Sequence, residues 1–185
     1  GDYLTLGGNY SYTDATYDES YLVTERNDFD LPNTLFQFAL DENGDRIQNA
    51  IGQNIFNLDA YVRDVQGNAL KRIPKHKGTV FGSYEVPTTM GMLAFSATYS
   101  YTGEYSSSAF KRAADLVPSR KRIDLSIGWK DDADRWAARF FVDNVTDERV
   151  YRGIGIGTEF SNYRTTGERL YPRYWGVDVT RRFGG

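Results

Sequence analysis

The chain has 185 residues and a net charge of -3 at pH 7, so it lacks the basic surface that displaces counterions from phosphates, and we exclude nucleic acid as a partner. The absence of cysteine excludes disulfide scaffolds and thiolate zinc sites. With 14 Tyr and 11 Phe against 5 Pro, the composition favours strands over helices, and we predict an all-β fold.

Six segments alternate apolar residues with small or polar ones, which is the period of a half-buried strand. Phe81 and Phe141 are exceptions to this alternation. No run of about 18 apolar residues is present, so we predict no transmembrane helix. The predicted antiparallel strands cover residues 4–13, 79–86, 93–102, 122–130, 135–143 and 175–183.

The connections between these strands are alternately short and long. "PTTMG" and "DDAD" have the length of turns, whereas the stretches at about 18–71, 106–118 and 147–170 are long loops. Short periplasmic turns and long extracellular loops are typical of transmembrane β-barrels. We therefore expect residues 1–185 to form about six strands of an antiparallel transmembrane barrel, with the long loops extracellular.

Large aromatic residues on the apolar face are predicted near the strand ends, with aliphatic residues between them. Such an arrangement is typical of the two aromatic girdles of a membrane barrel. A soluble β-sandwich, or a small β-barrel with its apolar face inward, is the alternative, but its aromatic residues would be scattered along each strand. The residues predicted near the short turns or the terminus are Tyr84, Trp129, Trp136 and Phe183. Those predicted near the long loops are Tyr10, Tyr12, Tyr99, Tyr101, Tyr171 and Trp175.

The opposite face carries charged residues that we predict in mid-strand. Charges in a dry protein core are costly, whereas a wet or plugged lumen tolerates them. This set consists of Arg122, Asp124, Arg135, Arg139, Asp143, Asp178 and Arg182.

The segments "FFVDNVTDERVYRG" and "YPRYWGVDVTRRF" together resemble the C-terminal signature of TonB-dependent outer-membrane receptors. "RIPKHKGTVFGSYEV" is similar to a strand of that family that descends from an outer loop. The residues that match the signature are Asn144, Val145, Thr146, Asp147, Tyr151, Pro172, Arg173, Gly176 and Phe183.

This resemblance implies a 22-stranded barrel around an N-terminal plug, of which this chain would be roughly the last six strands. It implies an outer-membrane receptor of a Gram-negative cell that imports a scarce ligand, such as an iron–siderophore, with energy coupled through TonB. The partners would be TonB (through an N-terminal part absent from this sequence), a small-molecule ligand, the lipid bilayer and the outer-membrane assembly machinery, which would read Phe183. No catalytic residue, metal or cofactor is expected, and the chain would not be an enzyme. Because it does not begin like a signal peptide, we expect a piece of a longer precursor.

Two of the long loops combine aromatic and arginine side chains, which suits an acidic ligand or an iron chelate. Aromatic rings stack on planar groups, and arginine pairs with carboxylate or hydroxamate oxygens. Arginine is also ordinary at a membrane rim. The ligand-binding candidates are Tyr105, Phe110 and Arg112 in the second loop, and Tyr151, Arg152, Phe160, Tyr163 and Arg164 in the third.

Two other functions are open at this point. A small self-contained outer-membrane barrel, acting as an adhesin or a structural protein, would need about two more strands, for instance from "YLVTERNDF" and "TLFQFAL" in the first loop. An outer-membrane hydrolase would need His76, the single histidine, beside a serine and an acid.

"DENGDR" brings three carboxylates together without the spacing of an EF-hand, and we predict a turn there.

Overall fold

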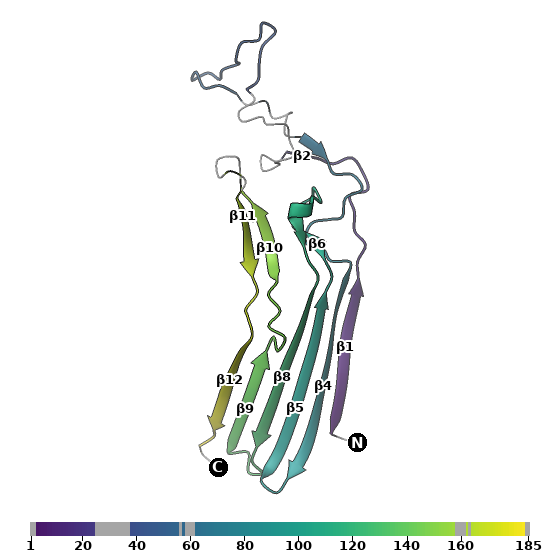
Figure 1. Ribbon diagram of the computed structural model, residues 1–185, viewed down its shortest axis with the longest axis vertical. Helices are drawn as coiled ribbons and strands as arrows, with labels where there is room; N and C mark the ends of the chain where they lie inside the picture. Colours follow the sequence, from purple (N-terminus) through teal and green to yellow (C-terminus); the bar gives the residue numbers. More distant parts are fainter. Residues whose placement is uncertain are drawn as a thin grey trace.

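The computed structural model describes residues 3–24, 38–55, 57, 62–157, 162 and 164–183. Its main element is a six-stranded antiparallel sheet in the order β1-β4-β5-β8-β9-β12 (Figure 1). All six predicted strands are confirmed. Their bounds are β1 Leu4–Tyr12, β4 His76–Thr88, β5 Gly91–Thr102, β8 Arg120–Lys130, β9 Trp136–Asp143 and β12 Tyr174–Arg181.

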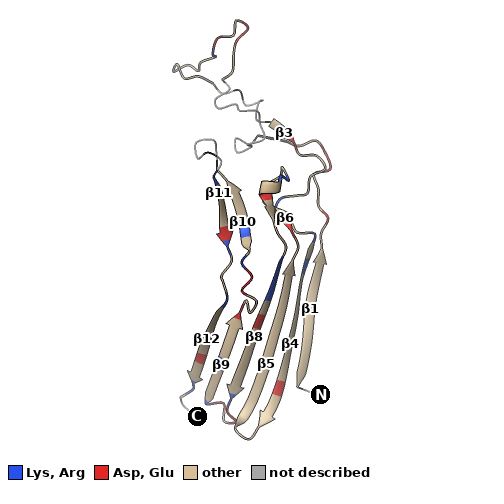
Figure 2. Ribbon diagram, viewed as in Figure 1, with Lys and Arg blue, Asp and Glu red and all other residues tan. Residues whose placement is uncertain are grey.

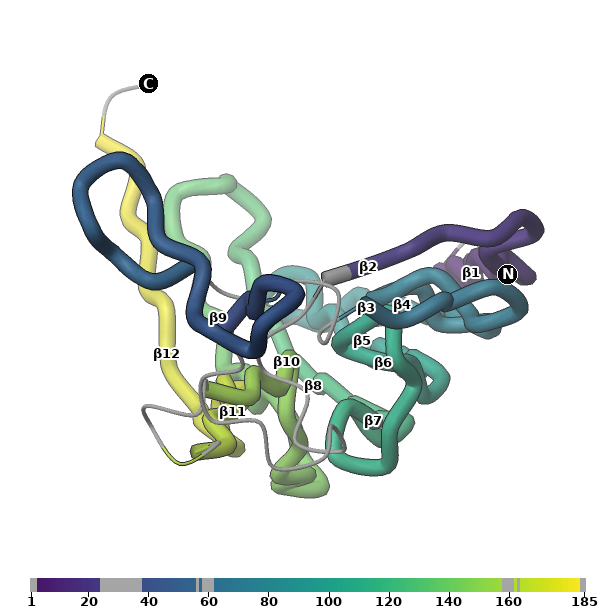
Figure 3. The backbone as a smooth tube through the Cα atoms, turned by 90° about the horizontal axis from the view of Figure 1, so that it is seen from above, coloured from purple at the N-terminus to yellow at the C-terminus, as the bar shows by residue number. Residues whose placement is uncertain are grey.

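The two ends of the sheet differ. The β4–β5 and β8–β9 turns lie at one end, where β1 begins and β12 ends (Figure 1). We call it the short-turn end, and the opposite end, from which the three long connections leave, the long-loop end. Seen along the strands, the sheet is curved rather than flat (Figure 3). Among the described strands, β1 and β12 each pair with a single neighbour, so the sheet has two edges.

The long connections contain short strands that the alternation did not predict. In the first, β2 (Leu22–Thr24) pairs with β3 (Val62–Asp64). In the second, β6 (Tyr105–Ser106) pairs with β7 (Leu116–Val117), and a short 3₁₀ helix covers Ala113–Asp115. In the third, β10 (Tyr151–Ile156) and β11 (Thr165–Arg169) form a hairpin. No helix in the described ranges has the length and apolarity needed to cross a membrane.

One face of the sheet is apolar and exposed from edge to edge. The strand register aligns one residue of each strand in a single row across this apolar face, and every side chain in the row is at least 37% exposed. Among the described residues, only Val65, Ala109 and Val117 are buried and apolar, and all three lie outside the sheet. This absence of a core contradicts the soluble sandwich. The row consists of Leu4, Tyr84, Phe95, Ile127, Phe140 and Val177.

The opposite, polar face explains the two exceptions to the alternation. Phe81 and Phe141 lie on it, each opposite a glycine of the neighbouring strand, Gly7 and Gly176 respectively. A Cβ atom on Gly7 would lie 2.4 Å from Phe81 Cζ, and one on Gly176 would lie 2.6 Å from Phe141 Cζ. Each ring therefore covers the strand where the glycine provides no side chain, a device that stabilises sheet edges.

Most of the predicted aromatic residues of the apolar face lie near the strand ends, as predicted. Tyr171 is an exception, since it precedes β12 and lines a pocket with Arg120 and Arg122 of the polar face. At the short-turn end, Trp129 Nε1 donates to the Met90 carbonyl at 2.9 Å. Three of the charges predicted in mid-strand lie elsewhere: Asp143 is the last residue of β9, and Arg135 and Arg182 lie just beyond the ends of β9 and β12. Arg135 precedes β9 because the chain turns at Asp131 to Asp134, and β12 ends at Arg181 because its partner β9 begins at Trp136. The alternation in the sequence continues through both arginines.

The first long connection contains a unit of two small hairpins that we call the double hairpin, residues 38–55. Three backbone hydrogen bonds form a ring, since the N–H groups of Ala39, Ile47 and Ile55 donate to the carbonyls of Ile55, Ala39 and Ile47. Eight residues separate equivalent positions, and each hairpin turns at a glycine with positive φ, Gly44 or Gly52. Figure 1 draws the unit beyond the long-loop end of the sheet.

The "DENGDR" segment forms the first of these hairpins. Asp41 Oδ1 accepts the backbone N–H groups of Asn43 and Asp45, both at 2.9 Å. The predicted turn is therefore confirmed.

Candidate functional site

A network of hydrogen bonds and ion pairs lies on the polar face at the long-loop end of β8. The register places Arg120, Arg122 and Asp124 on this face, opposite Thr102, Ser100 and Thr98 of β5. Figure 2 shows the basic stretch of β8 above an acidic band. The strand itself brings these side chains together, because alternate residues of a strand share a face.

Arg122 is balanced by two carboxylates. Its Nε donates to Asp124 Oδ1 at 2.7 Å, and its Nη2 lies 3.4 Å from Asp143 Oδ2. Asp124 Oδ1 also accepts the backbone N–H of Asn144 at 2.8 Å. This network joins β8 to the end of β9.

Asn144 is the centre of the turn that follows β9. It is 5% exposed and has a left-handed backbone, with φ of 53°. Its Nδ2 donates to the carbonyls of Glu148, at 3.0 Å, and Tyr171, at 3.3 Å, while its Oδ1 accepts the Glu148 N–H at 3.0 Å. One side chain thus ties the exit from β9 to the approach to β12.

A second link joins the same two segments. Asp147 Oδ1 accepts the Arg173 N–H at 3.0 Å, and Arg173 Nη1 donates to the Val145 carbonyl at 3.3 Å. The two sequence segments that carry the family resemblance therefore contact each other. Asn144, Asp147 and Arg173 act as structural residues of the third loop.

We expect Asn144→Ala to lower the stability of the third loop by about 2 kcal/mol, because the substitution removes three side-chain hydrogen bonds at a buried position. Hydrogen exchange of the amides between Glu148 and Tyr171 measures this change. Asn162→Ala, at an exposed asparagine that also has positive φ, is the control. Equal acceleration in both variants would contradict the role given to the Asn144 side chain.

The Asp147 carboxylate makes the same loop sensitive to acid. The Arg173 N–H, with the Arg149 side chain as a second cause, holds the pKa of Asp147 below its ordinary value of 3.8. A carboxyl group whose pKa is lower in the folded state stabilises that state above its unfolded pKa, and the contribution is lost as the pH falls through the folded value.

We therefore expect exchange at the Arg173 amide, corrected for its intrinsic rate, to accelerate as the pH falls below 3.8. Asp147→Asn keeps an acceptor oxygen but removes the charge, and should show no such step. A step of equal size in this variant would assign the acid sensitivity to another group.

A pocket of about 220 Å³ lies beside Asn144. Arg120 and Arg122 line it from β8, Glu148 and Tyr171 from the third loop. The Glu148 carboxylate is already engaged, since its Oε2 accepts the Lys121 N–H at 2.7 Å. Because Arg122 is already paired with Asp124 and Asp143, Arg120 is the arginine that gives the pocket the chemistry of an anion site.

The ligand-binding candidates of the second loop are partly engaged within the protein. The Tyr105 hydroxyl donates to the Arg152 carbonyl and joins the second loop to the third. Arg112 forms a nearly buried ion pair with Asp115 at 2.7 Å, and its guanidinium lies 5.1 Å from the centre of the Phe110 ring. The charge of Arg112 is thus balanced inside its own loop.

The candidates of the third loop lie on and around the β10–β11 hairpin. The Arg169 guanidinium lies 5.6 Å from the centre of the Tyr151 ring, and Arg152 pairs with Glu168 at 3.5 Å. Arg164 is exposed just before β11. Phe160 and Tyr163 lie outside the described residues. A ligand role for these residues stays a prediction.

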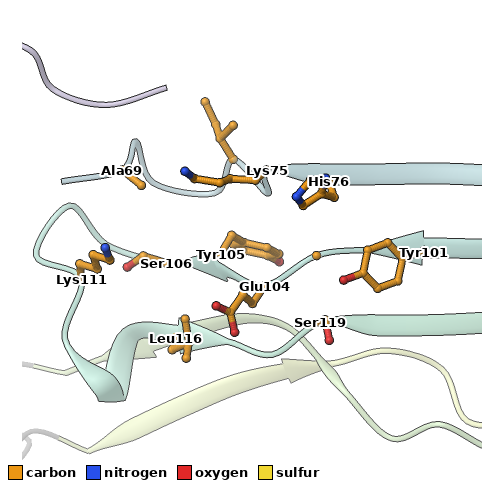
Figure 4. Close-up of a pocket in the computed structure, with 12 residues that line it drawn as sticks. Ala69, Lys75, His76, Tyr101, Glu104, Tyr105, Ser106, Lys111, Leu116 and Ser119 are labelled. Atoms are coloured by element: carbon orange, nitrogen blue, oxygen red, sulfur yellow. The ribbon is translucent and has the colours of Figure 1, made fainter. Parts of the chain in front are cut away.

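A second pocket, of about 420 Å³, lies at the base of the first and second loops (Figure 4). Tyr105 lines it together with Lys75, His76, Tyr101 and Lys111. His76 and Tyr101 belong to the apolar face by register, so this pocket borders that face rather than the polar one.

His76 also bears on the hydrolase alternative. Its Nδ1 forms a hydrogen bond with the Tyr10 hydroxyl at 2.8 Å, and its ring lies 5.3 Å from that of Tyr12. A catalytic histidine would instead contact a serine and an acid. His76 therefore packs against Tyr10 and Tyr12 at the long-loop end of the apolar face.

No protein-family model and no curated protein sequence matches the chain. Among solved structures, the ferric yersiniabactin uptake receptor of Yersinia pestis matches with a TM-score of 0.58 and 17% identity, over 65% of this chain and 18% of that one. The likeness is one of fold. It confirms that the six-stranded sheet has the fold of part of an outer-membrane β-barrel.

Two further receptors also match. The ferric preacinetobactin receptor of Acinetobacter baumannii has a TM-score of 0.48 and 14% identity, over 63% of this chain and 16% of that one. The ferripyoverdine receptor of the outer membrane of Pseudomonas aeruginosa has a TM-score of 0.47 and 17% identity, over 65% and 16%. In all three cases this chain spans less than a fifth of the solved receptor.

Proposed function

We propose that the chain forms part of the barrel wall of an outer-membrane receptor that imports a scarce ligand, such as an iron–siderophore, into a Gram-negative cell. The observation that carries this proposal is the apolar row that crosses the whole sheet while remaining exposed. A soluble protein rarely exposes such a surface, whereas lipid covers the outer face of a membrane barrel. The likeness in fold to the yersiniabactin receptor supports it.

The edges of the sheet favour a larger barrel over a small self-contained one. Unpaired strand edges are unfavourable in a bilayer, where each backbone polar group needs a partner. Of the two segments that could supply extra strands to a small barrel, "YLVTERNDF" is described only as far as Thr24, and its Leu22–Thr24 pairs with β3 rather than with the sheet; most of "TLFQFAL" lies outside the described residues. Further strands would therefore come from other parts of the receptor, together with the plug and the TonB contact.

An uptake assay tests this function. The full-length receptor would be expressed in a strain that lacks its own siderophore receptors, and accumulation of a panel of radioactive ferric chelates would be measured. We expect accumulation of at least one chelate that is lost when TonB is deleted. Two outcomes would overturn the proposal: a receptor that reaches the outer membrane but binds none of the chelates, or cells that accumulate the chelates equally well without TonB.

A further inference from the structure

Arg120 differs from the other arginines on the polar face of the sheet. Arg122 pairs with Asp124 and Asp143, and Arg139 pairs with Asp178 at 2.8 Å. Arg120 Nη1 is buried and has no hydrogen-bond partner, and no ion pair joins Arg120 to a carboxylate of the described residues.

This lack of a partner is costly. A buried polar group without a hydrogen bond loses its water without compensation, and the loss is greater for a charged group. Such a group in a native protein commonly indicates a ligand, a water or an ion. A guanidinium is best satisfied by a carboxylate, which accepts two parallel N–H bonds.

Arg120 as a whole is only half-buried, and its side chain lines a pocket that has room for this partner. The pocket of about 220 Å³ beside Asn144 is lined by Arg120 and Thr102 on the sheet and by Leu170 and Tyr171 on the third loop. The Glu148 carboxylate is held away by the Lys121 N–H, at 2.7 Å. Thr102 is 8% exposed and lies directly opposite Arg120, so the floor of the pocket is well packed.

We propose that Arg120 binds the carboxylate of a group seated in this pocket. The proposal rests on the proposed function, since it takes the polar face as the inner surface of the receptor. The carboxylate has two possible sources: an acidic small molecule that enters from the long-loop end, or an Asp or Glu of another part of the full-length receptor.

The first arm of the test uses purified full-length receptor in detergent and citrate as the probe, with uncharged trimethyl citrate as the matched compound. If the source is a small molecule, calorimetry should detect binding of citrate to the receptor but no binding of trimethyl citrate. Arg120→Met should then weaken citrate binding about tenfold, the usual value of a charge-assisted hydrogen bond. Arg135→Met, at the exposed short-turn end, should leave citrate binding unchanged.

The second arm detects a carboxylate of the receptor itself. Arg120→Lys keeps the charge and provides an amine, which a water-soluble carbodiimide joins to a contacting carboxylate as an amide. If the source is internal, peptide mapping of the ligand-free receptor should find this cross-link to an Asp or Glu other than Glu148, which lines the same pocket. Arg135→Lys is the control and should give none to the same carboxylate.

Either positive arm supports the proposal and names the source. Absence of both Arg120-dependent citrate binding and the cross-link, in variants that reach the outer membrane normally, would overturn it. Because both arms use purified receptor and need neither TonB nor transport, their failure is distinct from failure of the uptake assay.

Discussion

Ala97→Arg is expected to destabilise the receptor by about 2–4 kcal/mol, because it places a charge on the lipid side of a barrel near mid-strand. Ala97 lies near the middle of β5, between Gly82 and Leu125 on the apolar face. The measurement is denaturant unfolding of the full-length receptor in phospholipid vesicles, followed by tryptophan fluorescence. The yield of folded receptor in the outer membrane should fall in parallel.

The adjacent residue provides the matched control. Ser96 points to the polar face and lies between Ser83 and Ser126, so Ser96→Arg should change stability by less than about 1 kcal/mol. Equal losses in the two variants would contradict the assignment of the faces. A harmless Ala97→Arg would contradict the membrane location itself.

Gly91→Ala is expected to cost about 3 kcal/mol, because two effects act at one position. Gly91 has φ of 120°, a conformation that residues with a Cβ rarely adopt. A Cβ atom there would also lie only 2.0 Å from the carbonyl oxygen of Lys130, the last residue of β8. The β4–β5 and β8–β9 turns would have to separate.

The same unfolding assay measures this loss. Gly128→Ala is the control within the sheet, since its Cβ would meet its nearest neighbours at an ordinary 3.9 Å. We expect it to change stability by less than about 1 kcal/mol. If both substitutions were tolerated equally, the close contact between the two turns would not exist in solution.

The strands of the sheet could be predicted from sequence because both faces repeat with period two. Phe81 and Phe141 break the pattern only because each covers a glycine on the next strand, a pairing that depends on register. The β10 strand was missed because its alternation changes phase between Tyr151 and Gly153, where the register with β11 also shifts. Short strands inside long loops owe their pairing to tertiary contacts, which weak local patterns do not report.

The polar site was only partly predictable. Arg120 continues the alternation of Arg122 and Asp124, so it could have been found by extending the predicted strand by one step. That Arg120 lacks a partner depends on where the third loop folds. The Asn144 side chain donates a hydrogen bond to the carbonyl of Tyr171, 27 residues away, and no local sequence pattern indicates such a contact. Arg112, in contrast, has its acidic partner Asp115 only three residues ahead.

The backbone fold of the double hairpin depends on few of its side chains. The ring of hydrogen bonds at Ala39, Ile47 and Ile55 uses backbone atoms alone, and the turns depend on only a few residues, such as Asp41 and Asn49. Most other side chains of the unit are exposed. Successive variants of the protein could therefore carry different exposed side chains on this unit while keeping one backbone, and the six-stranded sheet would not have to change.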